Sequence, residues 1–206
     1  MIYDLHIHSK YSPDSLLKPE KIIKTAKNKG LDGVAITDHN TLKGGIEALK
    51  INKDPDFEII TGSEIRTEYG DVLGFFLNEE IEDRIFENVI DEIKSQGGIS
   101  VLAHPYRHYN APEEIIDKVN LVEGFNARSK SVYNMKSLAL ATKFNKSLTA
   151  GSDAHLYFEI GNGTISTEKN IEKSLKNGKT KIDGNESNYY LVHGLSVLIE
   201  KIKWLK

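Results

Sequence analysis

Histidines and carboxylates in this chain gather directly after short apolar runs, where a folded protein can bring them together. The residues that share this position are His6, His8, His39, Glu64, His104, Asp153 and His155. The chain contains no cysteine, so a metal ion bound by these residues would have only imidazole nitrogens and carboxylate oxygens as ligands. That ligand set suits zinc, manganese or iron. Carboxylates brought close together also need cations to neutralise them, and the pattern therefore predicts a cluster of divalent metal ions.

Two pairs of these residues are separated by a single position, His6 with His8 and Asp153 with His155. On an extended strand such residues point to the same side, so each pair could supply two metal ligands. One histidine by itself usually has an ordinary surface or core role, an interpretation that also fits His108 and His193. The metal hypothesis depends instead on five of the seven histidines following apolar runs.

The segments that would position these side chains alternate between two kinds. Short apolar runs typical of buried strands cover residues 2–6, 33–37, 58–61, 72–77, 99–103, 121–125 and 147–150, with a weaker candidate at 161–165. Segments interpreted as helices cover residues 19–29, 42–51, 84–96, 112–119, 132–145, 171–177 and 189–206. The alternation of helices with about seven strands predicts an α/β fold with a mostly parallel sheet, either closed as a barrel or open and doubly wound.

The barrel form would explain the position of the polar residues, because the carboxyl ends of its strands all open on one face. No glycine-rich phosphate fingerprint follows the first strand, which disfavours the open nucleotide-binding form. We interpret residues 195–205 as a cap on the bottom of the barrel, with a subunit contact as the alternative.

The composition fits one domain that spans residues 1–206. A formal net charge of −3 makes a basic face for nucleic acid an unfavoured interpretation. No apolar run approaches the length of a membrane-spanning helix, and the first residues lack the apolar segment of a signal peptide. We therefore expect a cytoplasmic protein without a membrane partner, and the composition does not indicate an oligomeric state.

Five motifs occur in a fixed order between residues 4 and 155. They are Asp4-Leu-His6-Ile-His8-Ser9, Ile36-Thr37-Asp38-His39-Asn40, Gly62-Ser63-Glu64, Ala103-His104-Pro105 and Gly151-Ser152-Asp153-Ala154-His155. Together they resemble the PHP family, named for polymerase and histidinol phosphatase. The resemblance implies a distorted (β/α)7 TIM-like barrel and a phosphoesterase activity that uses a metal-activated hydroxide.

The resemblance also implies two or three bound metal ions. By the family pattern, the first ion takes His6, His8, Glu64 and Asp153. Glu64 bridges to the second ion, which also takes His104, and the third takes Asp14, His39 and His155. Asp14 stands in a Ser-Pro-Asp loop that could also be a plain turn. Many family members have a histidine where this chain has Asp71, so either Asp71 replaces that ligand or the second ion is bound more weakly.

A small phosphorylated substrate, such as a nucleotide or a compound like histidinol phosphate, would need cationic partners. Arg107 and Arg128 each follow an apolar run and suit a two-pronged grip on phosphate, although both could be ordinary surface residues. Asn126 could line the same pocket or belong to a turn. Either His108 or a metal-bound water could act as the general acid for the leaving group.

Two other functions fit part of the pattern. An amidohydrolase-type metal hydrolase also uses a His-x-His pair, but it often bridges its ions with a modified lysine, whereas the bridging position here falls on Glu64. A noncatalytic PHP-like accessory module would not need to keep a nearly complete ligand set.

Overall fold

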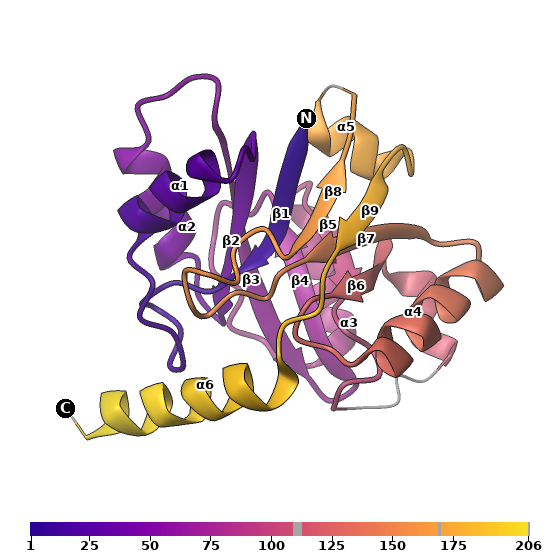
Figure 1. Ribbon diagram of the computed structural model, residues 1–206. Coiled ribbons are helices and arrows are strands. Elements are labelled where there is room, and N and C mark those ends of the chain that lie inside the picture. Colours follow the sequence, from indigo (N-terminus) through magenta and orange to yellow (C-terminus); the bar gives the residue numbers. More distant parts are fainter. Residues whose placement is uncertain (109–112, 169, 206) are drawn as a thin grey trace.

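The computed structural model describes residues 1–108, 113–168 and 170–205, and within these residues nine strands form one curved sheet (Figure 1). The strands are β1 (Ile2–Ile7), β2 (Gly33–His39), β3 (Glu58–Thr67), β4 (Gly70–Phe75), β5 (Ile99–Leu102), β6 (Leu121–Asn126), β7 (Ser147–Gly151), β8 (Gly163–Ser166) and β9 (Lys181–Gly184). Their order across the sheet is β7-β6-β5-β4-β3-β2-β1-β8-β9.

The sheet curves almost completely into a barrel, and β1 lies where its two sides meet. β2 pairs in parallel with one edge of β1. On the other edge, the antiparallel hairpin of β8 and β9 pairs with the start of β1 at Ile2 and Tyr3. Further along, Ile7 forms a parallel bridge with Ala154, and His8 donates its backbone N–H to the Ala154 carbonyl at 2.9 Å. The chain therefore has the α/β barrel-like architecture that its alternating pattern predicted.

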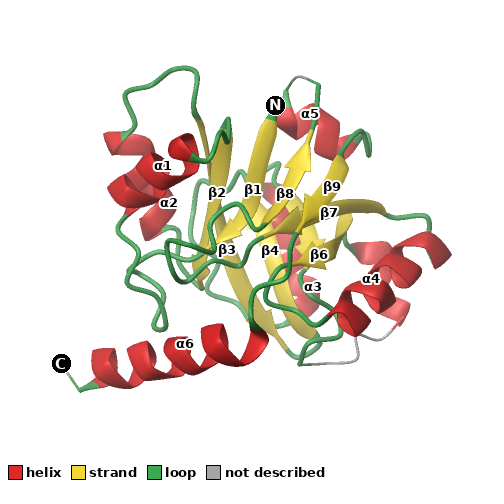
Figure 2. Cartoon of the chain, viewed as in Figure 1, coloured by secondary structure: helices red, strands yellow, loops and turns green. Residues whose placement is uncertain are grey.

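The helices surround this sheet, as Figure 2 shows by colour. They are α1 (Pro19–Asn28), α2 (Lys43–Ile51), α3 (Phe86–Ser95), the short 3-10 helix η1 (Glu113–Lys118), α4 (Ser131–Lys143), α5 (Ile171–Lys176) and α6 (Tyr189–Trp204). α1 begins with Pro19, whose fixed φ suits a first helical turn, and ends before Gly30, which has a left-handed φ of 77°. Its buried face, with Ile22 and Ala26, packs in one core with residues of β1 and β2. Burial of a side chain such as Ile22 contributes about 1.5–3 kcal/mol, so packing rather than helix propensity stabilises this layer.

One region departs from the expected parallel alternation. β4 runs antiparallel to both β3 and β5. The sequence interpretation ended one strand at residue 61 and began the next at 72, but β3 continues to Thr67 and β4 starts at Gly70. Only Glu68 and Tyr69 lie between the strands, and a parallel connection needs a crossover of about a dozen residues or more. The prediction of a mostly parallel sheet was therefore wrong at β4 and at the β8–β9 hairpin.

Two smaller predictions also differ from the structure. β9 was not predicted, because Ile182 is the one apolar residue in its four positions and no apolar run marks the strand. The segment predicted as a helix over 112–119 is the 3-10 helix η1 in its described part, and residue 112 lies outside the described residues. The last predicted helix reached residue 206, which also lies outside them.

α6 lies at the mouth of the barrel and not at its bottom, so the predicted cap was wrong. After β9, the backbone N–H of Ser187 donates to the carbonyl of Ala127 at 2.7 Å, just beyond the end of β6. This contact directs the chain toward the carboxyl ends of the strands. From there α6 runs past the loop that follows β1 (Figure 1). Nζ of Lys203 donates to the Ser12 carbonyl of that loop at 2.5 Å. Among the described residues, none of the helices has the length and apolarity that a membrane crossing requires.

Candidate metal centre

His6 and His8 meet at the mouth of the barrel, with their Nε2 atoms 3.1 Å apart. The register of β1 against β2 shifts between Asp4 and Ile7, where β1 has one extra residue. Such a bulge re-aims the side chains of a strand; His6 lies within it and His8 just beyond it, and both histidines are fully buried. The two imidazoles thus lie side by side, as their spacing suggested.

Two carboxylates face these rings. Oε2 of Glu64 lies 3.2 Å from Nε2 of His8, and Oδ1 of Asp153 lies 3.1 Å from the same atom. Both oxygens are buried, yet they accept no hydrogen bond of proper geometry among the described residues. An unsatisfied buried acceptor costs about 1–3 kcal/mol, and a divalent cation would satisfy both oxygens at once. The residues present therefore fit a bound metal ion.

Asp153 reaches this position without the extended backbone that its spacing to His155 suggested. β7 ends at Gly151, and Asp153 has a left-handed φ of 55°. Nδ1 of His155 donates to the Asp153 carbonyl at 2.8 Å, and Nε2 of the same ring faces Oδ2 of Asp14 at 2.8 Å. A non-glycine residue in this conformation costs of order 1–3 kcal/mol, a strain often found at functional sites.

A second group contains His8, Asp14, His39 and His155, and one ligand atom of each lies within 4.8 Å of the others. Asp14 belongs to the loop between β1 and α1, and its Oδ2 lies 2.8 Å from Nε2 of His155 and 3.5 Å from Nε2 of His39. The structure therefore brings Asp14 into the cluster. His39, at the end of β2, also places its Nδ1 3.1 Å from Oε2 of Glu64.

A third group contains Glu64, Asp71 and His104, again within 4.8 Å of one another. Oε1 of Glu64 lies 2.9 Å from Nε2 of His104. Asp71 is buried in β4, and its Oδ1 accepts a hydrogen bond from Nε of Arg66 at 3.2 Å. Asp71 therefore lies close enough to Glu64 and His104 to share a metal ion with them.

The charges of the cluster are strongly coupled. Burial disfavours the charged form of His6, but the carboxylates of Asp153, Glu123 and Glu64 outweigh it and raise the pKa of His6 well above its ordinary value. Burial also disfavours ionised Asp153, but Arg107 and His6 hold its pKa well below its ordinary value. A proton on His6 therefore offsets the nearby carboxylates when no ion is bound, and a divalent ion would replace that proton.

Glu123 of β6 is a buried partner of the ligands that the sequence interpretation missed. Its Oε1 accepts from Nδ1 of His6 at 2.9 Å, and its Oε2 accepts the backbone N–H of His104 at 2.8 Å. These bonds orient His6 and fix the strand end that carries His104. A signal was present, because Glu123 is a charged residue inside the apolar run 121–125.

Arg107 and Asn126 lie beside the cluster. Nη1 of Arg107 donates to Oδ2 of Asp153 and, at 3.3 Å, to Oδ1 of Asn126. Nη2 of Arg107 lies 2.8 Å from Nε2 of His104.

Arg107 and His108 line a cleft of about 160 Å³ that opens next to the metal groups. Burial and the charge of Arg107 lower the pKa of His108 to about 4, so its ring is neutral at pH 7. A neutral ring has no proton to give as a general acid until a bound anion raises its pKa.

Arg128 lines the same cleft but already has a carboxylate partner. Its Nε and Nη2 donate to the two carboxylate oxygens of Glu159 at 2.8 and 3.0 Å, and Nη2 also donates to the Val192 carbonyl at 3.2 Å. The expected two-pronged grip of Arg128 on phosphate would require these buried bonds to break. The sequence interpretation missed this partner because Glu159 lies 31 positions away.

A model of the PHP domain matches residues 4–160 of the chain, the segment that contains all the grouped histidines and carboxylates. The chain belongs to the PHP family. Two uncharacterized proteins of Methanocaldococcus jannaschii are similar in sequence. One is 47% identical over 114 residues, which cover 50% of this chain and 67% of the relative. The other is 36% identical over 186 residues, which cover 84% of this chain and 73% of the relative.

The PHP fold is also found in a solved structure. A two-domain protein from Bacteroides vulgatus containing a predicted PHP-like metal-dependent phosphoesterase has a TM-score of 0.76 and 19% identity to this chain. The similarity covers 90% of this chain and 65% of that protein. The PHP match of this chain ends at residue 160, so β8, α5, β9 and α6 lie beyond it.

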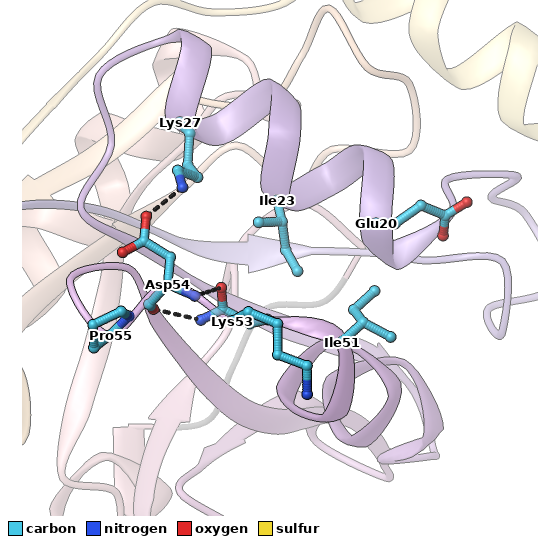
Figure 3. A pocket seen from close by; sticks show the side chains of 8 residues that line it. Glu20, Ile23, Lys27, Ile51, Lys53, Asp54 and Pro55 are labelled. Atoms are coloured by element: carbon cyan, nitrogen blue, oxygen red, sulfur yellow. Dashed lines mark hydrogen bonds and ion pairs between the residues drawn. The ribbon is translucent and has the colours of Figure 1, made fainter.

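Another hollow lies on the outside of this PHP barrel, between α1 and the turn after α2 (Figure 3). It has a larger volume, about 550 Å³, but no histidine lines it. Lys27 reaches across it to pair with Asp54, and Ile23 and Ile51 line its wall. The titratable groups that could hold a metal lie instead at the barrel mouth, which we take as the functional site.

Proposed function

We propose that this PHP chain is a phosphoesterase that binds two or three divalent ions (zinc, manganese or iron) and hydrolyses a small phosphate ester. The proposal depends on the position of Glu64. Its two carboxylate oxygens lie within 3.2 Å of ring nitrogens from His8, His39 and His104. A carboxylate shared among three imidazoles in this way suits a bridge between neighbouring ions.

Ions held there would lower the pKa of a water molecule toward neutrality and neutralise charge on a bound phosphate. The residues of the chain hold and orient the parts of this site. Glu123 accepts from Nδ1 of His6, so Nε2 of His6 faces the centre of the cluster. Glu64, Asp153 and Asp14 supply the negative charge that balances the ions.

Arg107 is the residue we assign to phosphate binding. Its Nη atoms contact Asp153, Asn126 and His104, but its Nε has no acceptor among the described residues. The Arg107 side chain lines the cleft, so a phosphate oxygen bound there can accept a charge-assisted bond from its guanidinium, and bonds of this kind are strong. Asn126 keeps the guanidinium in place, and His108 contacts the substrate on the leaving-group side.

The size of the cleft supports a small substrate. It encloses about 160 Å³, whereas pockets that bury drug-sized ligands have about 300–1,000 Å³. A phosphate group with a small substituent fits, and so does the phosphorylated end of a nucleotide or a histidinol-phosphate-like compound whose remainder extends from the mouth.

The test uses metal-free protein reloaded with Mn²⁺ or Zn²⁺ and a panel of phosphate monoesters and diesters. Wild-type protein should release phosphate or alcohol from at least one ester only when loaded. The double variant His6→Ala/His8→Ala should lose both the bound metal and the activity while its circular dichroism remains that of a folded protein. Full activity in the double variant would reject the proposal.

The same experiment separates the alternative functions. Turnover of a cyclic amide without turnover of any ester would favour an amidohydrolase. Folded wild-type protein that takes up no metal would favour a noncatalytic module.

A further inference from the structure

α6 lies beyond the residues matched by the PHP domain, yet it forms one wall of the cleft. His193, Ser196 and Val197 of this helix line the cleft together with Asp14 and His39. α6 also appears as a separate rod beside the barrel mouth (Figure 1). The helix therefore contributes to a site whose other parts all come from the matched domain.

The first turn of α6 is attached to the barrel. Nη2 of Arg128 donates to the Val192 carbonyl, and Arg128 itself is held by Glu159. Val192 is buried, so this end of the helix is fixed by both packing and hydrogen bonding.

The last turn of α6 is attached to the loop between β1 and α1. Nζ of Lys203 donates to the backbone carbonyls of Lys10 at 2.7 Å, Ser12 at 2.5 Å and Ser15 at 3.1 Å. An ammonium group has three N–H donors, so these three acceptors saturate it. The contact spans more than 180 positions of the sequence and joins the end of the helix to one short loop.

The carbonyls that Lys203 binds lie on both sides of Asp14. Ser12 precedes Pro13 and Asp14, and Ser15 follows them. Oδ1 of Asp14 is buried and accepts no hydrogen bond from any residue that the structure describes, so the loop backbone and His155 decide where this carboxylate stands. Ser12 also places its Oγ 3.0 Å from Nδ1 of His8, which links the same loop to a second ligand.

We propose that Lys203 is a positioning residue for the metal group formed by His8, Asp14, His39 and His155. Its ammonium group holds the loop so that Asp14 faces the two histidines, and α6 thereby becomes part of the metal site. The inference rests on the proposed function, because it requires that this group binds an ion.

The experiment measures Mn²⁺ binding to metal-free protein by isothermal titration calorimetry. Lys203→Met keeps the apolar stem but removes the donors, and Lys203→Arg keeps the charge and several donors. Lys201→Met is the matched control, because Lys201 is an exposed lysine in the same turn of α6. Asp14→Asn identifies which bound ion depends on Asp14.

Lys203→Met should raise the Kd of the Asp14-dependent ion about tenfold or more and leave the other ions within about twofold. Lys203→Arg should recover part of this loss, and Lys201→Met should bind as wild type. A purely structural role would weaken all ions or none, so the selective loss is the supporting result. Lys203→Gln serves the same comparison if Lys203→Met does not fold.

An unchanged isotherm in Lys203→Met, together with loss of one ion in Asp14→Asn, would overturn the inference and leave the proposed function intact. If Asp14→Asn also binds as wild type, or if wild type binds no Mn²⁺, the metal cluster of the proposed function fails and the inference falls with it.

Discussion

Nδ1 of His6 lies 2.9 Å from Oε1 of Glu123, although 117 positions separate the two residues in the sequence. The carboxylate orients the imidazole and increases its basicity, while Nε2 of His6 faces the other ligands. Such partners of metal-binding histidines commonly change metal affinity by about 10–100-fold when they are removed.

Glu123→Gln should therefore weaken Mn²⁺ or Zn²⁺ binding by about 10–100-fold. The amide removes the negative charge beside His6, and its NH₂ group would face the backbone N–H of His104, which Oε2 of Glu123 now accepts. Competition with a metal-sensitive dye measures the effect. An affinity equal to that of wild type would show that Glu123 does not tune this ligand.

The raised pKa of His6 predicts the pH dependence of the metal-free protein. A group whose folded-state pKa is raised stabilises the fold fully below its unfolded-state value, about 6.5 for histidine, and loses this contribution as the pH rises through the folded value. The difference in free energy of unfolding between wild type and Glu123→Gln should therefore be largest below about pH 6.5 and shrink toward higher pH. Urea unfolding in the presence of a chelator measures it, and a difference that grows with pH would contradict this assignment.

If Glu64, Asp71 and His104 bind an ion together, Asp71→Ala should weaken or remove it, because Asp71 is the third residue of that group. Asp71→His should retain the ion, since an imidazole is the ligand that many PHP members use at this position. Arg66→Gln is the control, because it removes the donor to Asp71 but no ligand. Metal content after gel filtration reports the result, and full metal content in Asp71→Ala would exclude Asp71 as a ligand.

Glu159→Gln should destabilise the protein by about 3–5 kcal/mol, because it leaves the charge of Arg128 buried without its partner. Arg128 is 3% exposed and Glu159 is fully buried, so water cannot compensate. Glu172→Gln is the matched control, since Glu172 pairs with Lys176 at the surface and should change stability by no more than about 0.5 kcal/mol. Urea unfolding of the two variants compares the pairs, and similar small effects would refute the structural role of Arg128.

Gly151→Ala should destabilise the contact between the end of β7 and β1 and weaken metal binding. A Cβ at Gly151 would lie 2.3 Å from Cβ of His6 and 2.8 Å from its backbone nitrogen, so β1 and β7 would have to separate. Overpacking of this kind costs about 1–3 kcal/mol or more. Gly194→Ala in α6 is the opposite case, because nothing lies within 4 Å of the added Cβ, and it should stabilise by about 0.5–1 kcal/mol. Thermal unfolding of both variants tests the contrast; a neutral Gly151→Ala would mean that the strands separate without cost.

The sequence by itself indicated the kinds of candidate ligand, their order along the chain and the strands near which they lie, although Glu64 lies inside β3 and not after it, because β3 continues to Thr67. Local patterns suffice for these features: apolar runs mark buried strands, and a polar residue directly after a run such as 33–37 must stand at a strand end. The PHP motifs likewise lie within short windows, so residues such as His6, Glu64 and His155 could be named without coordinates.

Only the tertiary structure decided which long-range partner each polar group has. Glu123 with His6, Glu159 with Arg128 and Lys203 with the Asp14 loop are contacts across the barrel mouth, and no periodicity in the sequence encodes them. The bulge in β1 and the antiparallel β4 depend on how strands pair, which in turn depends on chain closure around the whole barrel. Which residues could bind a metal can be read from short sequence motifs. How these residues are arranged is set by packing and charge compensation between segments that are distant in the sequence.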